Sequence, residues 1–476
     1  MRERQVVLFE AFECGGRWWL PDAPETVVGG SLKYSRDELS VRLDGTLGSV
    51  SVEQMGVLAS DFRRFDRLHG VLDDGQKCTL FRAFVTAFTG SWMVCSGIYL
   101  VVGYHLEGLD QLRFDGVSAS PSKLDEFLDR NVFAVQATDA VDQATLTYTK
   151  PERQVFAISS ISARFEIDST FRLKGDRNMA EAIAGSHFNI IPDSPQPLEW
   201  FQKTLWRLCD LLTLLTDEPC HACWIRVTPN GDPCDGPLLY TSSGPHRERD
   251  ALRSSVLLFY FSQLADRLGP ILEKWFSASD VLLSAIYLFR DAHRSADPSN
   301  RGRFLILSQA LEAFSRATMP GAYMADGDYE RVKNALVAAI PSEVGEDHRA
   351  SLKNRIKYGN EHSLRKRLSG LLGSMGPQMV ACVCASASDF TSGIVDTRHY
   401  FTHLTDELRP KALSGIPLAW ACDKLQMLLR LLLLRWVGVD EQLIVARVTH
   451  HPRLAQYIYL GNRQRECIKT PTQNTN

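Results

Sequence analysis

The stretch Ala296-Asp-Pro-Ser-Asn-Arg-Gly302 separates two kinds of sequence pattern. Proline, glycine and small polar residues in succession interrupt regular structure, so a domain boundary is expected here. Before it, several segments alternate apolar and polar residues as strands do; after it, apolar residues recur every three or four positions, as in helices. The chain is therefore predicted to be a multidomain α+β protein, with a β-rich N-terminal region that includes helices and an all-α bundle after it.

Residues 1–190 carry the strand patterns. Leu32 and Tyr34 alternate with polar residues, as do Leu39, Val41 and Leu43, and Arg36-Asp37 lies between the two segments as a turn. The run from Met93 to His105 and the segments around 155–175 predict further strands. Strands at this spacing indicate a sandwich-like or barrel-like domain.

Residues 191–297 are predicted to be a mixed, mainly helical continuation of the N-terminal region. A helix is expected to begin near Ser194, because leucines and Phe201 then recur at helical spacing up to Leu215. Further helices are expected over 248–276 and 280–294. The all-α domain is predicted over 298–470, with helical segments near 304–314, 329–340, 351–372 (interrupted near Gly359-Asn360), 377–409, 413–437 and 440–448, and a frayed tail from Lys469.

Charge is distributed unevenly between the two parts. The 476 residues have a net charge of −3, yet 23 Lys and Arg face 16 Asp and Glu from Arg301 onward, leaving 30 against 40 before it. Contact with a polyanion is therefore expected in the last part. Composition, at 45% hydrophobic and 23% charged, excludes a disordered or collagen-like chain.

The expected location is the cytoplasm. Eleven scattered cysteines, an odd number, favour a reducing compartment over a disulfide framework. The N-terminus lacks the apolar run of a secretory signal. The most apolar stretch, Leu425–Val437, is shorter than the roughly 20 residues that span a bilayer and is predicted to be a core or dimer-interface helix, so no membrane partner is expected.

One constellation carries recognisable chemistry: Asp396-Thr-Arg398-His399-Tyr400-Phe401-Thr402-His403, within the helix predicted after Pro377. Arg398 and His403 have four residues between them. A permanently charged guanidinium can hold two phosphate oxygens, and an imidazole can accept or donate a proton near neutral pH. The alternative without a catalytic role is that both residues lie at a solvated helix end, where cations are favoured.

With these residues, the last part of the chain resembles the HEPN superfamily of helical, metal-independent RNases, which is defined by an Arg, a polar residue and a His in this spacing. More closely, it resembles the ApeA-type anti-phage proteins, which join a β-rich N-terminal region to such a domain. Further matching features lie on both sides of the boundary: Gly16–Pro21, Gln309–Phe314 and Tyr358–Arg365.

The resemblance implies a cytoplasmic RNA endonuclease that needs no cofactor or metal and acts as a dimer. Attack of the 2′-hydroxyl on the adjacent phosphate would leave 2′,3′-cyclic phosphate and 5′-hydroxyl ends. We expect His403 to move protons and Arg398 to stabilise the transition state. His399, in the motif's polar position, and Glu312, matching an acidic residue of an earlier helix, are expected to support them, although each also fits an ordinary surface position.

The spacing itself favours a dimer. On one straight helix Arg398 and His403 lie about 140° apart around the axis and about 7.5 Å along it. Arg398 lies at one flank of a predicted apolar stripe of Phe390, Ile394, Phe401 and Leu404, and His399 and His403 lie on the opposite side. Arg398 and His403 converge poorly on one ligand from a single copy. Two copies about a two-fold axis would build a composite groove.

Two other clusters of residues could bind a ligand. The basic residues Arg365, Lys366 and Arg367, like Lys353, Arg355 and Lys357, are candidates for RNA phosphate contacts or for solvated helix faces. Cys220-His221-Ala-Cys223, with Cys234 and His246, suggests a zinc site, but the spacing is wrong for a standard module, and ordinary thiols beside a strand at Trp224–Val227 are the favoured interpretation.

The resemblance therefore implies an anti-phage RNase with RNA (tRNA among the candidate targets) as substrate, a homodimer through its HEPN-like domain, and an N-terminal region that senses a phage-derived trigger or restrains the nuclease. The rival hypothesis is a non-catalytic RNA- or protein-binding dimer with a degenerate HEPN domain.

Overall fold

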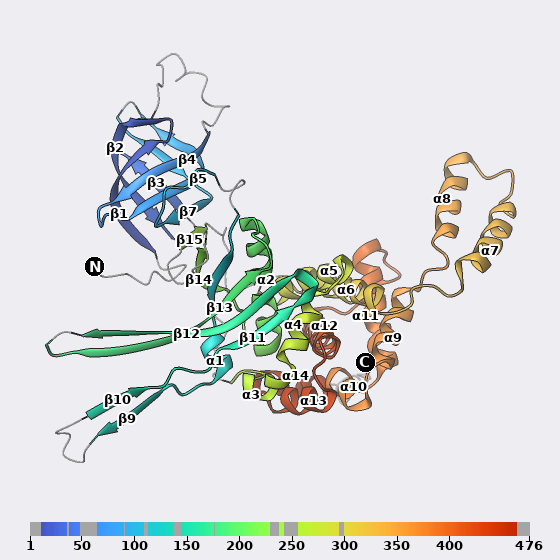
Figure 1. Ribbon diagram of the computed structural model, residues 1–476. Coiled ribbons are helices and arrows are strands. Elements are labelled where there is room, and N and C mark those ends of the chain that lie inside the picture. Colours follow the sequence, from blue (N-terminus) through green and yellow to red (C-terminus); the bar gives the residue numbers. More distant parts are fainter. Residues whose placement is uncertain are drawn as a thin grey trace, which may run out of the picture. The chain divides into compact units, whose positions relative to one another are not determined.

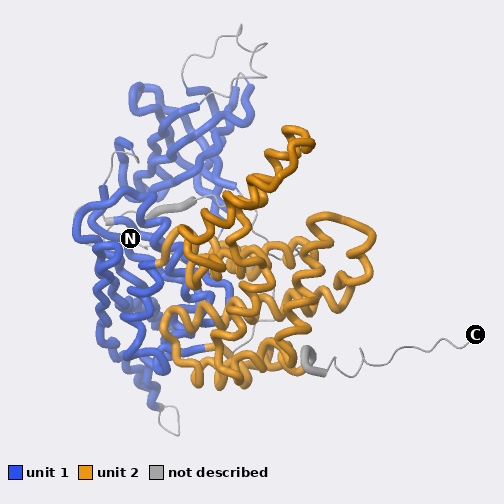
Figure 2. Tube along the Cα trace, turned by 90° about the vertical axis from the view of Figure 1, so that its right-hand side faces the viewer, with its two compact units in different colours: residues 1–247, 259–277 blue, residues 248–258, 278–476 orange. Residues whose placement is uncertain are grey.

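The computed structural model describes residues 11–35, 38–47, 64–89, 91–108, 113–137, 144–175, 177–228, 238–241, 256–294 and 299–463. The chain forms two compact units, coloured separately in Figure 2. Unit 1 comprises residues 1–247 and 259–277, and unit 2 comprises residues 248–258 and 278–476.

A closed barrel occupies the first part of unit 1 (Figure 1). Six described strands pair in the ring order β1-β2-β3-β6-β5-β4, each antiparallel to its neighbours. They are β1 (Phe12–Leu20), β2 (Ala23–Tyr34), β3 (Leu39–Leu43), β4 (Arg64–Leu72), β5 (Lys77–Phe88) and β6 (Met93–Ser96). Closure leaves none of these strands with the open edge of a flat sheet.

The predicted alternation in this region is confirmed. Leu32, Tyr34, Leu39, Val41 and Leu43 are each at most 2% exposed and fill the barrel together with Trp18. Arg36 and Asp37, the expected turn, lie outside the described residues. The run Met93–His105 is not one strand: it is divided near Gly97 into β6 and β7 (Tyr99–Val102), because β6 pairs with β3 whereas β7 pairs with β15.

The sheet continues beyond the barrel through β5, which also pairs with β7. From there the strand order is β7-β15-β14-β8-β13-β12-β11. The new strands are β8 (Gly116–Pro121), β11 (Gln154–Ile158), β12 (Ala163–Gly175), β13 (Ala180–Pro192), β14 (Ala222–Thr228) and β15 (Leu238–Thr241). A separate two-stranded ribbon is formed by β9 (Phe133–Ala137) and β10 (Ala144–Tyr148).

Unit 1 also contains helices, three of which contact β8, β11, β13 or β14. They are α1 (Leu124–Leu128), α2 (Leu198–Thr216), α3 (Phe261–Leu264) and α4 (Leu268–Phe276). The predicted stripe of α2 is buried from Leu198 to Leu215, although the helix begins after Pro197 rather than at Ser194. The helix predicted over 248–276 is wrong in its first part, because residues 256–260 are not helical and Tyr260 has extended backbone angles.

Unit 2 is helical, as predicted. Its helices are α5 (Asp280–Arg294), α6 (Asn300–Thr318), α7 (Asp326–Ala338), α8 (Glu346–Lys357), α9 (Leu364–Gly373), α10 (Pro377–Val383), α11 (Ala387–His403), α12 (Gly415–Trp436), α13 (Glu441–His450) and α14 (Pro452–Arg463). The expected interruption near Gly359-Asn360 separates α8 from α9. α14 was not predicted, and the tail from Lys469 lies outside the described residues.

The leucine-rich run of α12 lies in the hydrophobic core. Leucines from Leu425 to Leu434 on α12 are at most 3% exposed. Arg430 is buried among them, its guanidinium 3.4 Å from His293 Nδ1 and 5.7 Å from the centre of the Phe289 ring on α5. These contacts explain how an arginine is accommodated within an apolar run.

No single helix in the described part of the chain has the length and apolar composition needed to cross a membrane. The pair α10 and α11, bent by 44° at its break, meets the criteria jointly by length and composition alone.

Candidate functional site

The motif Arg398–His403 lies on α11, the second of two helices where the sequence suggested one. Cys384 has extended backbone angles and ends α10, and the Ser386 hydroxyl then accepts a hydrogen bond from the Asp389 amide to begin α11. This is the usual capping role of serine. The helix ends at His403, so the motif occupies its last two turns.

The predicted apolar stripe of α11 is partly wrong. Ile394 is buried as expected, and Thr391, Val395 and Thr397 are buried beside it. Leu404, however, lies past the helix end in the left-handed conformation (φ 55°) and is 57% exposed. Helical periodicity no longer applies to a residue beyond the last turn, which leaves the His403 end of the helix open to solvent.

Arg398 is paired with Glu312 of α6. Its Nη2 lies 3.6 Å from Glu312 Oε2, and its side chain is 37% exposed. Glu312 Oε1 also accepts a hydrogen bond of 3.1 Å from Arg316, one helical turn further along α6. One carboxylate thus holds two guanidinium groups, each partly open to solvent.

A second carboxylate extends this network. Glu361, just before α9, lies 2.8 Å from Arg316 and 3.9 Å from Arg367. Although burial opposes the change, hydrogen bonds to Glu361 and Glu312 raise the pKa of Arg316. Three arginines and two glutamates therefore form one cluster, here called the Glu312 cluster: Arg316, Arg367, Arg398, Glu312 and Glu361.

His399 and His403 are both exposed near the end of α11. Their rings lie edge to face, with centroids 6.4 Å apart. The structure therefore brings Arg398 together with Glu312, and His399 together with His403. His403 follows Arg398 by five positions on this helix. The two side chains therefore point to different sides of the helix.

The basic residues of α9 do not share one surface. Arg365 donates a hydrogen bond of 2.7 Å to Ser392 Oγ and lies 3.8 Å from Asp396, both on α11. Lys366 is exposed. Arg367 is 3% exposed and donates to the His362 carbonyl; burial and the neighbouring Arg316 cation lower its pKa. Lys353, Arg355 and Lys357 are exposed along α8.

The sequence interpretation missed Arg316 and Glu361. Arg316 follows Glu312 by four positions, the spacing at which opposite charges pair on a helix, so it was accessible from sequence. Glu361 had no such local signal, because it lies in the connection between α8 and α9.

The cysteine cluster lies at the start of β14. Cys220 is buried, and its thiol donates to the Glu218 carbonyl, while the His221 ring lies 3.4 Å from the Ser122 hydroxyl. The strand predicted at Trp224–Val227 is β14. Cys234, His246 and the side chain of Cys223 lie outside the described residues, and among those that are described no group of three or more His, Cys, Asp or Glu is arranged to hold a metal ion.

A β-barrel region followed by a helical unit with an Arg-x4-His pair on a late helix is the arrangement expected of a HEPN-type protein. Comparison with family models identifies the family: the model described as ApeA N-terminal domain 1 matches residues 13–275, and the model described as Apea-like HEPN matches residues 305–443. The chain belongs to the ApeA-like HEPN family, which points to anti-phage defence and nuclease activity. No curated protein matches the chain.

Proposed function

We propose that this protein is a metal-independent RNA endonuclease of anti-phage defence. The observation that carries the proposal is the pairing of Arg398 with Glu312 on the helix that also presents the exposed His399 and His403, inside the segment matched by the Apea-like HEPN model. Glu312 and Glu361 carry two negative charges against three from the arginines of the cluster. The surplus positive charge suits a phosphate group.

In the proposed reaction, the 2′-hydroxyl attacks the adjacent phosphorus and the bond to the 5′-oxygen breaks. His403 moves a proton in this step, and Arg398 stabilises the charge that develops on the phosphate oxygens. Glu312 orients Arg398, and His399 contacts the phosphate or His403. The products carry a 2′,3′-cyclic phosphate and a 5′-hydroxyl.

The proposed active form is a dimer through unit 2. Arg398 and His403 point to different sides of α11, so one copy presents the guanidinium and the imidazole poorly to a single phosphate. A two-fold axis near the end of α11 would place the His403 of each copy beside the Arg398 of the other. The exposed end of the helix, including Leu404 and His403, leaves room for such an approach.

End mapping tests the chemistry. Wild-type protein and His403→Ala are incubated with total cellular RNA, with and without lysate from infected cells, and the fragment ends are sequenced. We expect cyclic phosphate ends from the wild type and a rate about 10²–10⁴-fold lower from the variant, the usual contribution of a general acid or base. Activity in EDTA checks metal independence.

Equal cleavage by wild type and variant would remove His403 from the mechanism. If RNA binds but is not cleaved under any condition, the protein is the non-catalytic binding dimer instead. Sedimentation of the wild type across a concentration series tests the dimer independently of cleavage.

A further inference from the structure

An arginine at the start of α6 contacts the last turn of α11, the helix that carries the motif. Nη2 of Arg301 donates a hydrogen bond of 3.2 Å to the carbonyl oxygen of Phe401, which lies between Arg398 and His403 in the sequence. The same guanidinium lies over the Phe401 ring, 5.0 Å from its centroid. One side chain of α6 therefore binds both the backbone and the ring of a residue two positions before His403.

The carbonyl that Arg301 binds is one that α11 cannot satisfy by itself. The last carbonyl groups of an α-helix have no amide partner within the helix. In α11 the Leu404 amide donates a hydrogen bond of 2.7 Å to the Tyr400 carbonyl, and Leu404 then turns into the left-handed conformation. The next carbonyl, that of Phe401, lies beyond the regular hydrogen bonds of the helix. The Arg301 guanidinium takes the place of the missing amide.

Local preference does not explain this position of Arg301. It is the second residue of α6, after Asn300, and the helix is capped by Ser299. The first turn of a helix carries a partial positive charge, so a cation there is unfavourable, whereas the end of a helix carries a partial negative charge that favours a cation. Arg301 is therefore unfavourable for α6 alone and favourable for α11. The contact between the two helices gives the residue its role.

The start of α6 is itself held in place by α12. The Cys422 thiol donates a hydrogen bond of 3.3 Å to the Asn300 carbonyl. Nη1 of Arg303, a buried residue, lies 2.9 Å from Asp423 Oδ1. These contacts lie on both sides of Arg301 in the sequence, so the backbone from which its side chain reaches α11 is anchored.

The motif is thus attached to α6 at two places. Arg398 pairs with Glu312, at 3.6 Å. Closer to the end of α11, the Phe401 ring lies edge to face against Phe304, which is 0% exposed, with centroids 5.6 Å apart. The exposed Arg301 lies over the same Phe401 ring. The second attachment fixes the last turn of α11, where His403 lies.

We infer that Arg301 is a positioning residue for His403. Helix ends fray, and Arg301 opposes fraying by holding the carbonyl and the ring of Phe401. The last turn then keeps the His403 imidazole at a fixed place relative to Arg398, as proton transfer at hydrogen-bond distance requires. Arg301 acts through the helix and not on the reacting atoms. This inference rests on the proposed function for what His403 does with that position.

The first test measures cleavage by the full-length chain, with a labelled RNA oligonucleotide that contains a site cut by the wild type. Arg301→Ala should lower kcat about 10–100-fold, because a displacement of about 1 Å at reacting groups can cost about 10²-fold. KM should change less than about twofold, since Arg301 makes no contact with RNA in this inference. Arg301→Lys keeps a charged donor and should stay within about fivefold of the wild-type kcat.

The second test measures the last turn directly and needs no substrate. Amide hydrogen exchange is followed by mass spectrometry in peptides of α11. In Arg301→Ala, exchange over residues 398–404 should be at least about fivefold faster than in the wild type, because the last turn opens locally more often. Exchange over residues 391–396, earlier in the same helix, should not change. Arg301→Lys should restore most of the protection.

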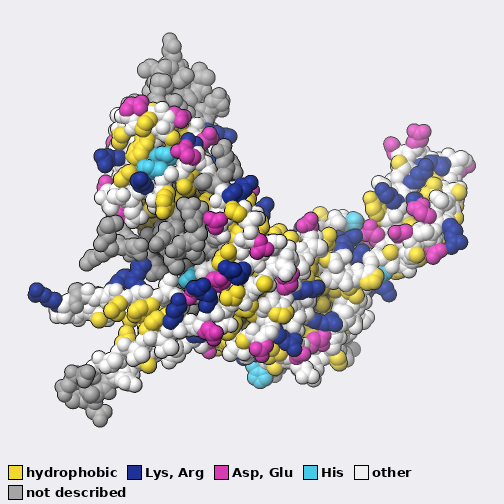
Figure 3. All heavy atoms as spheres, viewed as in Figure 1, with side chains coloured by type: hydrophobic (Ala, Val, Ile, Leu, Met, Phe, Trp, Pro, Cys, Tyr) yellow, Lys and Arg dark blue, Asp and Glu magenta, His cyan; other side chains and the backbone are white. Residues whose placement is uncertain are grey.

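A second arginine of unit 2 provides a matched control. Figure 3 shows Lys and Arg side chains on α7 and α8, and Arg349 of α8 donates hydrogen bonds to the Ile340 and Pro341 carbonyls that follow α7. Arg349→Ala therefore also removes an arginine that satisfies carbonyl groups after a helix. It should change kcat less than about twofold and leave exchange over residues 398–404 unchanged.

Unchanged exchange over residues 398–404 in Arg301→Ala would overturn the inference. So would a raised KM with unchanged kcat and a weaker salt dependence of RNA binding, because Arg301 would then be a phosphate contact. Dissociation of a wild-type dimer by Arg301→Ala in sedimentation would make it an interface residue instead. If the wild type cleaves no RNA, the proposed function fails, whereas the exchange measurement still decides whether Arg301 holds the last turn.

Discussion

The molecule contains two clusters of paired acids and cations, and they differ in which partner is buried. In unit 1, Glu166 and Asp168 are 7% and 8% exposed, whereas Arg153 and Lys150 are more than half exposed. In unit 2, Glu312 and Glu361 are 25% and 40% exposed, and their partners range from the buried Arg367 to the exposed Arg316.

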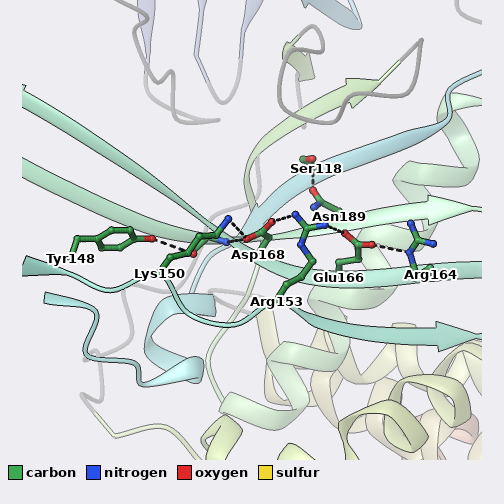
Figure 4. A network of polar contacts seen from close by, with 9 residues as sticks. Ser118, Tyr148, Lys150, Arg153, Arg164, Glu166, Asp168 and Asn189 are labelled. Atoms are coloured by element: carbon green, nitrogen blue, oxygen red, sulfur yellow. Dashed lines mark hydrogen bonds and ion pairs between the residues drawn. The ribbon is translucent and has the colours of Figure 1, made fainter.

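The comparison separates a structural role from a ligand-binding one. A buried carboxylate must be neutralised, so the cations of unit 1 stay paired with Glu166 and Asp168 and join β12 to the connection that follows β10 (Figure 4). The Glu312 cluster has one more arginine than glutamates, and two of its arginines, Arg316 and Arg398, are partly open to solvent. That excess favours an anionic ligand in unit 2 and a folding role in unit 1.

Replacing Arg398 of unit 2 is expected to have the largest effect, which is on the rate of RNA cleavage. Arg398→Ala should lower RNA cleavage about 10²–10³-fold, as loss of a transition-state donor does, while thermal stability changes little because Arg398 is at the surface. Cleavage rates and melting curves are measured together. Arg331→Ala, at an exposed pair with Asp328, is the control; an equal loss of cleavage there would contradict the assignment.

Breaking the buried cluster of unit 1 should act on stability instead. Asp168→Asn removes the charge that Lys150 and Arg153 neutralise and should cost about 1.5–3 kcal/mol of the free energy of unfolding, as for hydrogen bonds to charged groups. Denaturant titration measures it. Asp328→Asn, at an exposed pair, should cost less than about 0.5 kcal/mol. If the two variants cost the same, burial does not distinguish the clusters.

A smaller effect is expected from the carboxylate that orients Arg398. Glu312→Gln should reduce cleavage about fivefold, corresponding to roughly 1 kcal/mol for a partly exposed pair. Combined with Arg398→Ala, it should add nothing, because the residue it orients is gone. Cleavage rates of the wild type, the two single variants and the double variant test this expectation. An additive loss would show that Glu312 acts independently of Arg398.

The last expected effect concerns the pH dependence of the stability of unit 1. Burial, partly opposed by the charge of Asp168, lowers the pKa of His187, and burial, partly opposed by a hydrogen bond to Leu106, lowers that of His69. The unfolded chain therefore takes up protons first, and stability is lost as pH falls below about 6.5, by at most about 1.4 kcal/mol per pH unit and histidine.

Melting temperatures measured between pH 7.5 and 5.5 check this dependence. His187→Asn should reduce the slope, whereas His348→Ala, at an exposed position, should not. Stability that rises as pH falls through this range would show that the histidines are not the groups responsible.

Much of the fold was predictable because its signals are local. The alternation of Leu32, Tyr34, Leu39, Val41 and Leu43 identified strands, and the interruption at Gly359-Asn360 identified a helix end. Closure of the barrel was not predictable, since it depends on β1 meeting both β2 and β4. Helix α14 was missed, and the break at Cys384 was read as continuous helix because no proline or glycine marks it.

The candidate site, too, has features that follow from the sequence and features that only the packing of helices decides. The chemistry of Arg398, His399 and His403 and their spacing on one helix follow from the sequence, because the rise and turn of a helix are set by the backbone. That Glu312 meets Arg398, that Glu361 joins them, and that Arg367 is buried while Arg365 reaches Asp396 were decided by packing between helices. Such contacts join residues tens of positions apart, and no local pattern encodes which side chains will share a surface once the helices pack.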